Sequence, residues 1–473
     1  MGIFSGFIKG FSTIIPEVPK PIRKLPLNER ILWTAAALII YFIMIETPLY
    51  GVAAASDPLT YSRIIFASAR GTLMELGIGP IVTGGLIIQL LQGAQIVKLD
   101  LNKTEDRALF SSATKILTFV IALVECAAYL IGGAFGTSLT PQATVIVVVQ
   151  LLLATTIVML LDEMVQKGWG IGSGISLFIF AGVAVQIIWG ILSPLPVTEA
   201  NNVTSPYGFI PYVFTKVQNQ TGFSEIFYRS SGFPSILTVM LTLAVILLIV
   251  YVEGLRVEIP ITSARFRGFG GVYPIKFLYV SNIPIILTSA LLTNITFFSQ
   301  MAWARLNPNN DNFILNIFGT FNSTTNSPIG GLAYYITPPR GLAVLSADPM
   351  HAIVFILLLV GFSVLFARIW VEIGGLSPDA VAKKLVDAGV QVPGFRRSEM
   401  SISQILNKYI PALTLVGGLF IGLLAAFSDL FEVLGSGIGI LLMVDIGIQY
   451  YQTLVQEQIE EFMPRLGGLL GKK

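Results

Sequence analysis

Ionisable and amide side chains inside long apolar runs are few in this sequence, and the main ones are Gln89, Glu125, Asn294 and Asp445. A carboxylate at membrane depth costs free energy unless it faces a cavity or a partner. Glu125 and Asp445 are therefore candidates for a proton or ion relay, and a buried hydrogen bond between helices is the alternative for each. A proton-coupled transporter would use both carboxylates, although such proteins normally carry more groups of this kind.

Two pairs of aliphatic residues could close a pore without any ionisable group. Ile78 and Val82 are four residues apart, as are Ile171 and Ile175, so each pair would share one face of a helix. Glycines flank both pairs, and aliphatic side chains on such a backbone can form a constriction that water does not wet. Ordinary close packing of helices through small residues is the alternative, which the segment 418–422, with glycine at both ends, also suggests.

Basic residues gather in two predicted loops, 253–276 and 371–408, and a helix is predicted to start at Ser377-Pro378-Asp379. Arginines on protruding loops suit a phosphate-rich partner, such as ribosomal RNA or anionic lipid head groups. The alternative is that these charges only mark the side of the membrane on which the loops lie. The candidate arginines are Arg256, Arg265, Arg267, Arg396 and Arg397.

Few residues of this chain are suited to catalysis. It has one cysteine, Cys126, and one histidine, His351, so we expect no internal disulfide, no histidine-rich metal site and no Ser-His-Asp set. The glycine-rich strings at 168–172 and 435–437 lack the Gly-Lys-Ser/Thr of a phosphate-binding loop. We therefore expect no enzyme activity, no cofactor and no metal.

Membrane helices must position these residues. Of the 473 residues, 54% are hydrophobic and 12% are charged, and this charged share is about half that of a soluble protein. The predicted fold is therefore an all-α integral membrane protein. The runs long enough to cross about 30 Å of hydrocarbon as helices are 31–48, 77–97, 116–135, 143–161, 170–193, 236–252, 275–298, 352–368, 409–427 and 433–453.

The ten predicted spans divide into five and five, so the second half is inverted relative to the first, and a pore or site can form between them. With both termini in the cytoplasm, only six of the 29 Lys and Arg lie outside, which satisfies the positive-inside rule. The expected divisions are a cytoplasmic segment 1–30 with a possible interfacial helix, an N-terminal half 31–195, an external loop 196–235, a C-terminal half 236–455 and a cytoplasmic tail 456–473.

The stretch Tyr61–Leu76 fits neither a span nor an exposed loop. It contains Ile64, Ile65, Phe66 and Leu73, but also two arginines and a glutamate. Irregular segments at membrane depth are tolerated only where protein buries them or a cavity wets them. We predict a short re-entrant helix that enters a cavity from the outer side, and an interfacial helix is the alternative.

Several strings closely resemble the SecY family of protein-conducting channel subunits: GTLMELGIGPIVTGGLIIQLLQG (71–93), GWGIGSGISLFI (168–179), RVEIPITSARFRG (256–268) and PGFRRS (393–398). The resemblance runs in the same order over nearly the whole chain, and the residues of these motifs are similar to those of the archaeal and eukaryotic branch. It implies two pseudo-symmetric halves of five helices around a central pore, together with small single-span Sec subunits as partners.

The resemblance also implies roles for particular residues. A hydrophobic ring in the pore would consist of Ile78, Val82, Ile171, Ile175, Ile286 and Leu442, or its neighbour Leu441 in place of the last. A plug over about 56–70 would include Ile64, Ile65, Phe66 and Ala67. A lateral gate between spans 2 and 3 and spans 7 and 8 would carry a polar cluster of Thr83, Glu125 and Asn294.

The implied function is a passive channel. Nascent polypeptides with a signal sequence would pass through it, and apolar segments would leave sideways into membrane lipids. The ribosome, including its RNA, would dock on the loops that carry the five arginines. We expect a multi-pass protein of the cell membrane. Two alternatives stay open: the proton-coupled transporter, and a structural scaffold for a partner enzyme.

Overall fold

The structure, a computed structural model, describes most of the chain. The described residues are 16–52, 67–93, 96–97, 103–131, 135, 140–198, 204–219, 226–229, 233–263, 270–280, 283–322, 327–387, 390–391 and 399–470.

Each predicted span corresponds to a helix in this described part. The first half contains α2 (Leu27–Glu46), α4 (Gly79–Gly93), α5 (Thr104–Ile131), α6 (Pro141–Gln166) and α7 (Gly174–Leu192). The second half contains α10 (Ile236–Gly254), α11 (Ile283–Leu306), α15 (Pro349–Ile373), α17 (Glu399–Leu430) and α18 (Gly437–Leu470). In the described residues, nine helices are long and apolar enough to cross a membrane, and α4 is a shorter apolar helix. The predicted fold class, an all-α membrane protein, is confirmed.

Some helix ends differ from the predicted spans. Helix α7 starts at Gly174 rather than at 170, because Gly172 has a φ angle of +72° and Ser173 has an extended backbone. Helix α17 starts ten residues before the apolar run, since its first turns are polar and extend past the hydrocarbon. The start of the predicted span 275–298 is instead the end of a strand.

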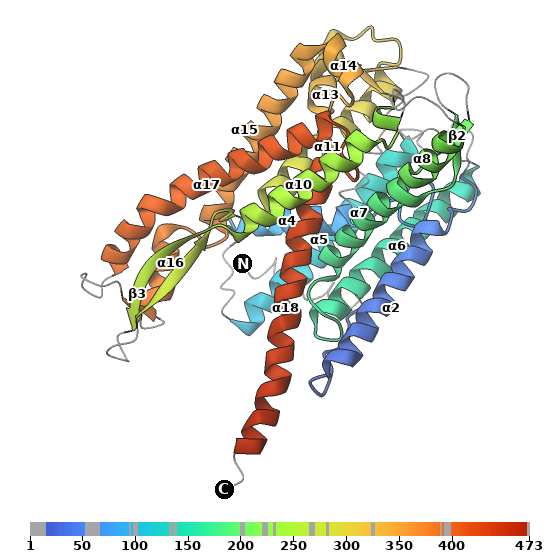
Figure 1. The fold of residues 1–473 in the computed structure, drawn as a ribbon. Helices are drawn as coiled ribbons and strands as arrows, with labels where there is room; N and C mark the ends of the chain where they lie inside the picture. The colour runs from blue at the N-terminus through green and yellow to red at the C-terminus, as the bar shows by residue number, and fades with distance from the viewer. Residues whose placement is uncertain are drawn as a thin grey trace.

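The two halves meet along two seams. At the first seam α7 packs against α18, and at the second α4 and α5 pack against α11 and α15. Figure 1 shows α2, α6 and α7 beside one another, with α10, α15 and α17 forming the opposite part of the molecule and α18 extending far beyond both. Residues of both halves contribute to one large apolar core, here called the main apolar cluster.

Small residues bring α15 and α17 into close contact. A Cβ atom on Gly422 would lie 2.9 Å from the Val360 Cα, and one on Gly418 would lie 3.1 Å from the Ala367 Cβ. The Ser363 hydroxyl donates a hydrogen bond to the Gly418 carbonyl at 2.9 Å. Close packing through small residues is therefore the correct interpretation of segment 418–422.

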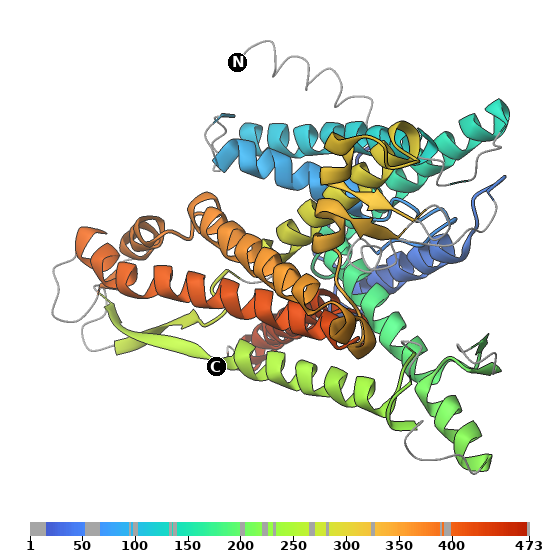
Figure 2. The same ribbon diagram turned by 90° about the horizontal axis from the view of Figure 1, so that it is seen from above.

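The two predicted basic loops, 253–276 and 371–408, contribute strands to one sheet. Strand β3 (Arg256–Ser263) pairs antiparallel with β4 (Gly270–Lys276) and with β7 (Val390–Gln391). The helix predicted near 377 is α16 (Pro378–Asp387), and it packs on α17. Figures 1 and 2 both show this hairpin next to α16 and the start of α17, at one end of the molecule.

Short elements lie in the two loops at the opposite end. They are β1 (Pro196–Thr198), β2 (Thr204–Pro206), α8 (Phe209–Gln218), α12 (Phe313–Phe318), β5 (Thr320–Phe321), β6 (Pro328–Gly330), α13 (Gly331–Ile336) and α14 (Leu342–Ala347). Arg229 fastens the first loop, because its guanidinium donates to the carbonyls of Tyr207 and Pro234 and stacks 3.8 Å from the ring centroid of Tyr212.

Candidate functional site

None of the six predicted ring residues is exposed. Ile78, Ile171 and Leu442 are buried, and the other three are half-buried. Five of the six belong to the main apolar cluster or pack against it, and they come from the start of α4 and from α7, α11 and α18. Ile171 is buried but lies outside that cluster. Leu441 and Leu442 are equally buried, so burial does not decide which of them is the sixth ring residue.

The prediction that each pair shares one helix face is correct for the first pair only. The Val82 amide donates to the Ile78 carbonyl at 3.0 Å, so these two residues are one helical turn apart. Ile171 precedes the first residue of α7 and is not helical. The left-handed backbone at Gly172 separates Ile171 from the helix that carries Ile175.

One predicted plug residue, Ala67, falls in the described part of the chain, while Ile64, Ile65 and Phe66 lie outside it. Ala67 is buried in the main apolar cluster, and its carbonyl accepts a hydrogen bond from the Tyr41 hydroxyl of α2 at 3.4 Å. Residues 67–76 form turns, in which the Glu75 carboxylate accepts from the Gly71 amide at 2.5 Å. This end of the segment is thus held inside the core.

The predicted gate residues lie on helices that meet at the second seam. Thr83 is on α4, Glu125 is on α5 and Asn294 is on α11, and all three are half-buried. Helices α4 and α5 approach closely, because a Cβ on Gly84 would lie 2.9 Å from the Thr118 hydroxyl oxygen. The structure therefore groups the elements that carry the predicted cluster.

Two further contacts cross the seam between α5 and α11, and the sequence did not predict them. The rings of Tyr129 and Phe297 lie 4.7 Å apart between centroids. Arg305 donates from Nε to the Ile131 carbonyl at 2.5 Å, at the last residue of α5. An aromatic pair is worth about 0.5–1.5 kcal/mol beyond its buried area. The position of Arg305 at the outer end of an apolar run was the only available signal.

Asp445 is not grouped with Glu125. It is buried on α18, where Gln449 of the same helix donates to its Oδ2 at 2.8 Å and the Glu253 carboxylate of α10 lies nearby. Lys276 lies 3.7 Å from the Glu253 carboxylate. Among the described residues, no group of three His, Cys, Asp or Glu is placed to hold a metal ion.

The basic loops have one described candidate arginine. Arg256 is exposed at the start of β3 and lies opposite Lys276 in the strand register. Since β3 also pairs with β7, the sheet joins the two basic loops into one surface. Arg265, Arg267, Arg396 and Arg397 lie outside the described residues.

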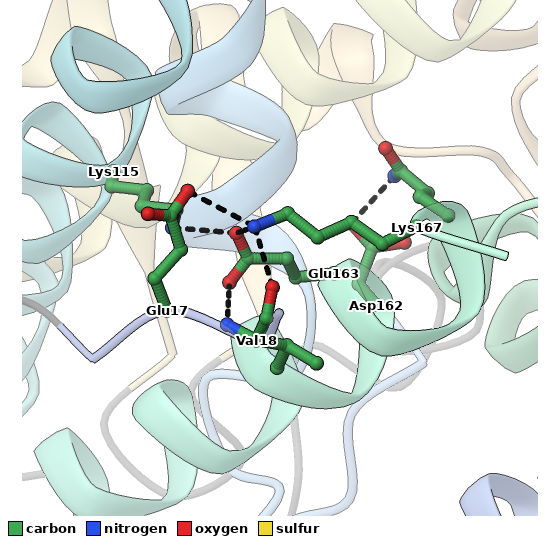
Figure 3. A network of polar contacts seen from close by, with 7 residues as sticks. Glu17, Val18, Lys115, Asp162, Glu163 and Lys167 are labelled. Atoms are coloured by element: carbon green, nitrogen blue, oxygen red, sulfur yellow. Dashed lines mark hydrogen bonds and ion pairs between the residues drawn. The ribbon is translucent and has the colours of Figure 1, made fainter. Parts of the chain in front are cut away.

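The segment before α2 is bound to the end of α6 by charged groups, as Figure 3 shows. Lys167 donates to the Glu17 carboxylate at 3.0 Å and to the Val18 carbonyl at 2.6 Å. The Val18 amide donates to Glu163, which also forms an ion pair of 2.7 Å with Lys115 of α5. This network fixes the N-terminal segment across two helices of the first half.

The network predicts that the N-terminal segment detaches at both pH extremes. The Lys167 hydrogen bond lowers the pKa of Glu17 below its ordinary 4.5, so this stabilisation is present above about pH 4.5 and is lost as the pH falls through the lowered pKa. Burial opposes the charge of Lys167, but hydrogen bonds to Glu163 and Glu17 outweigh it and raise its pKa above 10.5. That stabilisation is present below pH 10.5 and is lost as the pH rises through the raised pKa.

Trp169 provides the measurement, because its indole N–H donates to the Pro19 carbonyl at 2.8 Å. Its fluorescence, taken as the difference from Trp169→Phe, should change below about pH 4.5 and above about pH 10.5. Glu17→Gln should remove the acid transition, and it should shift the alkaline one to lower pH because Glu17 also raises the pKa of Lys167. An unchanged acid midpoint in this variant would contradict the assignment.

Comparisons with known proteins agree with this arrangement. A family model described as SecY matches residues 72–451, and one described as the plug domain of Sec61p matches residues 39–71. The chain is similar to the protein transport protein Sec61 subunit alpha of Dictyostelium discoideum, with 40% identity over 478 residues. The match covers 98% of this chain and 99% of that protein.

Two solved structures have the same fold over nearly their whole length. One is the structure of a protein conducting channel, with 36% identity and a TM-score of 0.79, covering 96% of this chain and 98% of that chain. The other is Sec61 in the canine ribosome-channel complex from the endoplasmic reticulum, with 35% identity, a TM-score of 0.77 and the same coverage.

Proposed function

The chain belongs to the SecY family. On this basis we propose which residues seal the channel, which form its lateral gate and which bind the ribosome. The protein is the central pore-forming subunit of a Sec translocon. It is a passive channel that lets signal-bearing polypeptides cross the membrane and releases apolar segments sideways into lipid. Such a channel needs no catalytic chemistry of its own, and the energy for transport comes from its partners.

The seal of the resting channel is the ring of Ile78, Val82, Ile171, Ile175, Ile286 and Leu442. The observation that carries this proposal is their joint shielding: none is exposed, although they come from both halves and from separate helices. Aliphatic groups meeting in a pore exclude water, and ions cannot cross a dry constriction without losing their hydration shells. A polypeptide chain can separate the ring because only dispersion contacts hold it closed.

The plug over about 56–70 supports this seal in the resting state. Its described end, Ala67, is buried beside Tyr41 of α2. Movement of the plug would therefore expose part of the main apolar cluster, which a translocating chain can cover. This links entry of a substrate to the loss of the seal.

The lateral gate is the seam where α4 and α5 meet α11 and α15. Thr83, Glu125 and Asn294 form its polar cluster, and the contact between Tyr129 and Phe297 supports the closed state. An apolar segment of about 20 residues partitions through this seam into lipid according to its transfer free energy. Weak contacts suit a gate of this kind, since it must open for each segment.

The ribosome is the partner that docks on the basic sheet. Ribosomal RNA binds the two basic loops, and the side chains that contact its phosphates are Arg256, Arg265, Arg267, Arg396 and Arg397. The structural relative in the canine ribosome-channel complex supports the ribosome as a partner. Small single-span Sec subunits complete the channel.

The chain is a multi-pass membrane protein. We place both termini in the cytoplasm, because this orientation puts most of its lysines and arginines there. Its motifs are similar to those of the archaeal and eukaryotic branch, and we propose the cell membrane as its location.

Photocrosslinking tests the proposed function. A photoreactive residue at position 175 should form an adduct with a secretory chain stalled on a bound ribosome, because the chain must pass the ring. The same residue at Leu243, a lipid-facing position of α10 that is 57% exposed, is the control and should give none. Absence of any adduct at 175 with the ribosome properly bound would overturn the proposal.

A further inference from the structure

The end of the segment that joins α6 to α7 and the first turn of α7 carry one proposed ring residue each, Ile171 and Ile175, and three helices hold the backbone there. The Ile171 amide donates to the Thr34 hydroxyl of α2 at 3.0 Å. The Ser173 carbonyl accepts from the Tyr450 hydroxyl of α18 at 2.8 Å. The Ile175 amide donates to the Asp162 carboxylate of α6 at 2.9 Å. Each of these bonds ends on the backbone, so none depends on the side chains of the segment.

Glycines alternate with these bonded positions, and each one lies against one of the three holding side chains. A Cβ on Gly170 would be 3.0 Å from the Thr34 hydroxyl oxygen, and one on Gly172 would be 2.9 Å from the Tyr450 ring. A Cβ on Gly174 would be 2.5 Å from the Asp162 Cα. Contacts this short leave no room for a side chain.

The holding groups are themselves fixed. Asp162 is 7% exposed, and its second oxygen accepts a hydrogen bond from Gln166 at 2.8 Å. The Thr34 hydroxyl donates to the Arg30 carbonyl one turn earlier in α2. Arg30 in turn donates to the Gly170 carbonyl at 2.9 Å and pairs with Glu457 of α18.

We propose that Thr34, Asp162 and Tyr450 are positioning residues that clamp segment 170–175 and thereby set the places of Ile171 and Ile175 in the seal. This inference rests on the proposed function of the ring. Two of the three come from the first half and Tyr450 comes from the second, so the clamp crosses the seam between α7 and α18. The GWGIGSG string is then the sequence signature of a clamped, non-helical segment.

Cysteine accessibility tests the clamp in the full channel complex reconstituted in vesicles. The background is Cys126→Ala, with a single cysteine introduced by Ile171→Cys, Ile175→Cys or Ile286→Cys. Loss of one hydrogen bond should raise the rate of labelling by a membrane-impermeant maleimide about 2- to 10-fold. Tyr450→Phe should do so for Ile175→Cys, and Thr34→Val should do so for Ile171→Cys.

The control is Tyr451→Phe, whose ring is 68% exposed beside the clamp residue, and it should change no rate. Ile286→Cys on α11 separates the clamp from general loosening, because its labelling should stay constant in Tyr450→Phe. Equal increases at all three cysteines, or none at 171 and 175, would overturn the clamp. Failure of the proposed seal is a different outcome: the ion conductance would stay unchanged both when Ile175 and when Leu442 is replaced by asparagine, each in the otherwise unaltered chain.

Discussion

Replacing Ile175 by asparagine is expected to raise the resting ion conductance of the reconstituted channel at least about tenfold. The ring keeps ions out because its aliphatic surface does not hold water, and an amide gives water two donors and an acceptor at that place. Burying one such aliphatic side chain away from water stabilises the closed ring by about 1.5–3 kcal/mol, and the replacement by asparagine removes this free energy. Because about 1.4 kcal/mol corresponds to a factor of ten, a tenfold effect is the lower bound.

Planar bilayer recordings measure this conductance directly. Ile175→Leu keeps the volume and the apolar character of the residue, so it is the matched control and should leave the conductance near its original level. The same asparagine at Leu442, which is fully buried on α18, should also open a leak. If both asparagine variants conduct as little as the unaltered channel, these residues do not form the seal.

Replacing Gly422 by leucine is expected to lower stability by about 1–3 kcal/mol or more, because the new side chain would overpack the contact between α15 and α17. Its Cβ alone would lie 2.9 Å from the Val360 Cα, and a backbone atom cannot move aside without its helix. Separation of the helices would also break the hydrogen bond between Ser363 and the Gly418 carbonyl.

Thermal unfolding in detergent, followed by circular dichroism, measures this loss. Gly361→Leu on α15 is the matched control, because a Cβ at Gly361 would have nothing within 4 Å. In a helix interior, leucine is favoured over glycine by up to about 1 kcal/mol, so the control should be neutral or slightly more stable. Equal destabilisation by both variants would show that close packing at Gly422 is not the cause.

Much of the fold could be predicted from segments taken one at a time. A long apolar run predicts a crossing helix whatever its neighbours are, and every predicted span is a helix in the described residues. The ends of the helices could not be predicted as well from single segments. Gly172 looks like a small residue inside an apolar run, yet its left-handed backbone delays the start of α7, and the Tyr450 ring lies where its Cβ would be.

The candidate site shows the same division. The spacing predicts that Ile78 and Val82 share one helix face, and the structure confirms this. The same spacing predicts a shared face for Ile171 and Ile175, and that prediction is wrong because Ile171 precedes the helix. The roles of Ile286 and Leu442 came from family resemblance, since nothing in their local sequence distinguishes them from other apolar residues. The contact between Arg305 and Ile131 joins residues 174 positions apart, which no local pattern reports.

The amino-acid sequence alone determined that this chain spans a membrane in two halves, because insertion into lipid depends on the apolar length of each segment and on the charges beside it. The tertiary structure alone decided which residues meet: that one sheet joins the two basic loops, and that side chains of α2, α6 and α18 bind the backbone around the start of α7. These contacts depend on how helices distant in the chain pack, and that packing is a property of the whole set of helices rather than of any one of them.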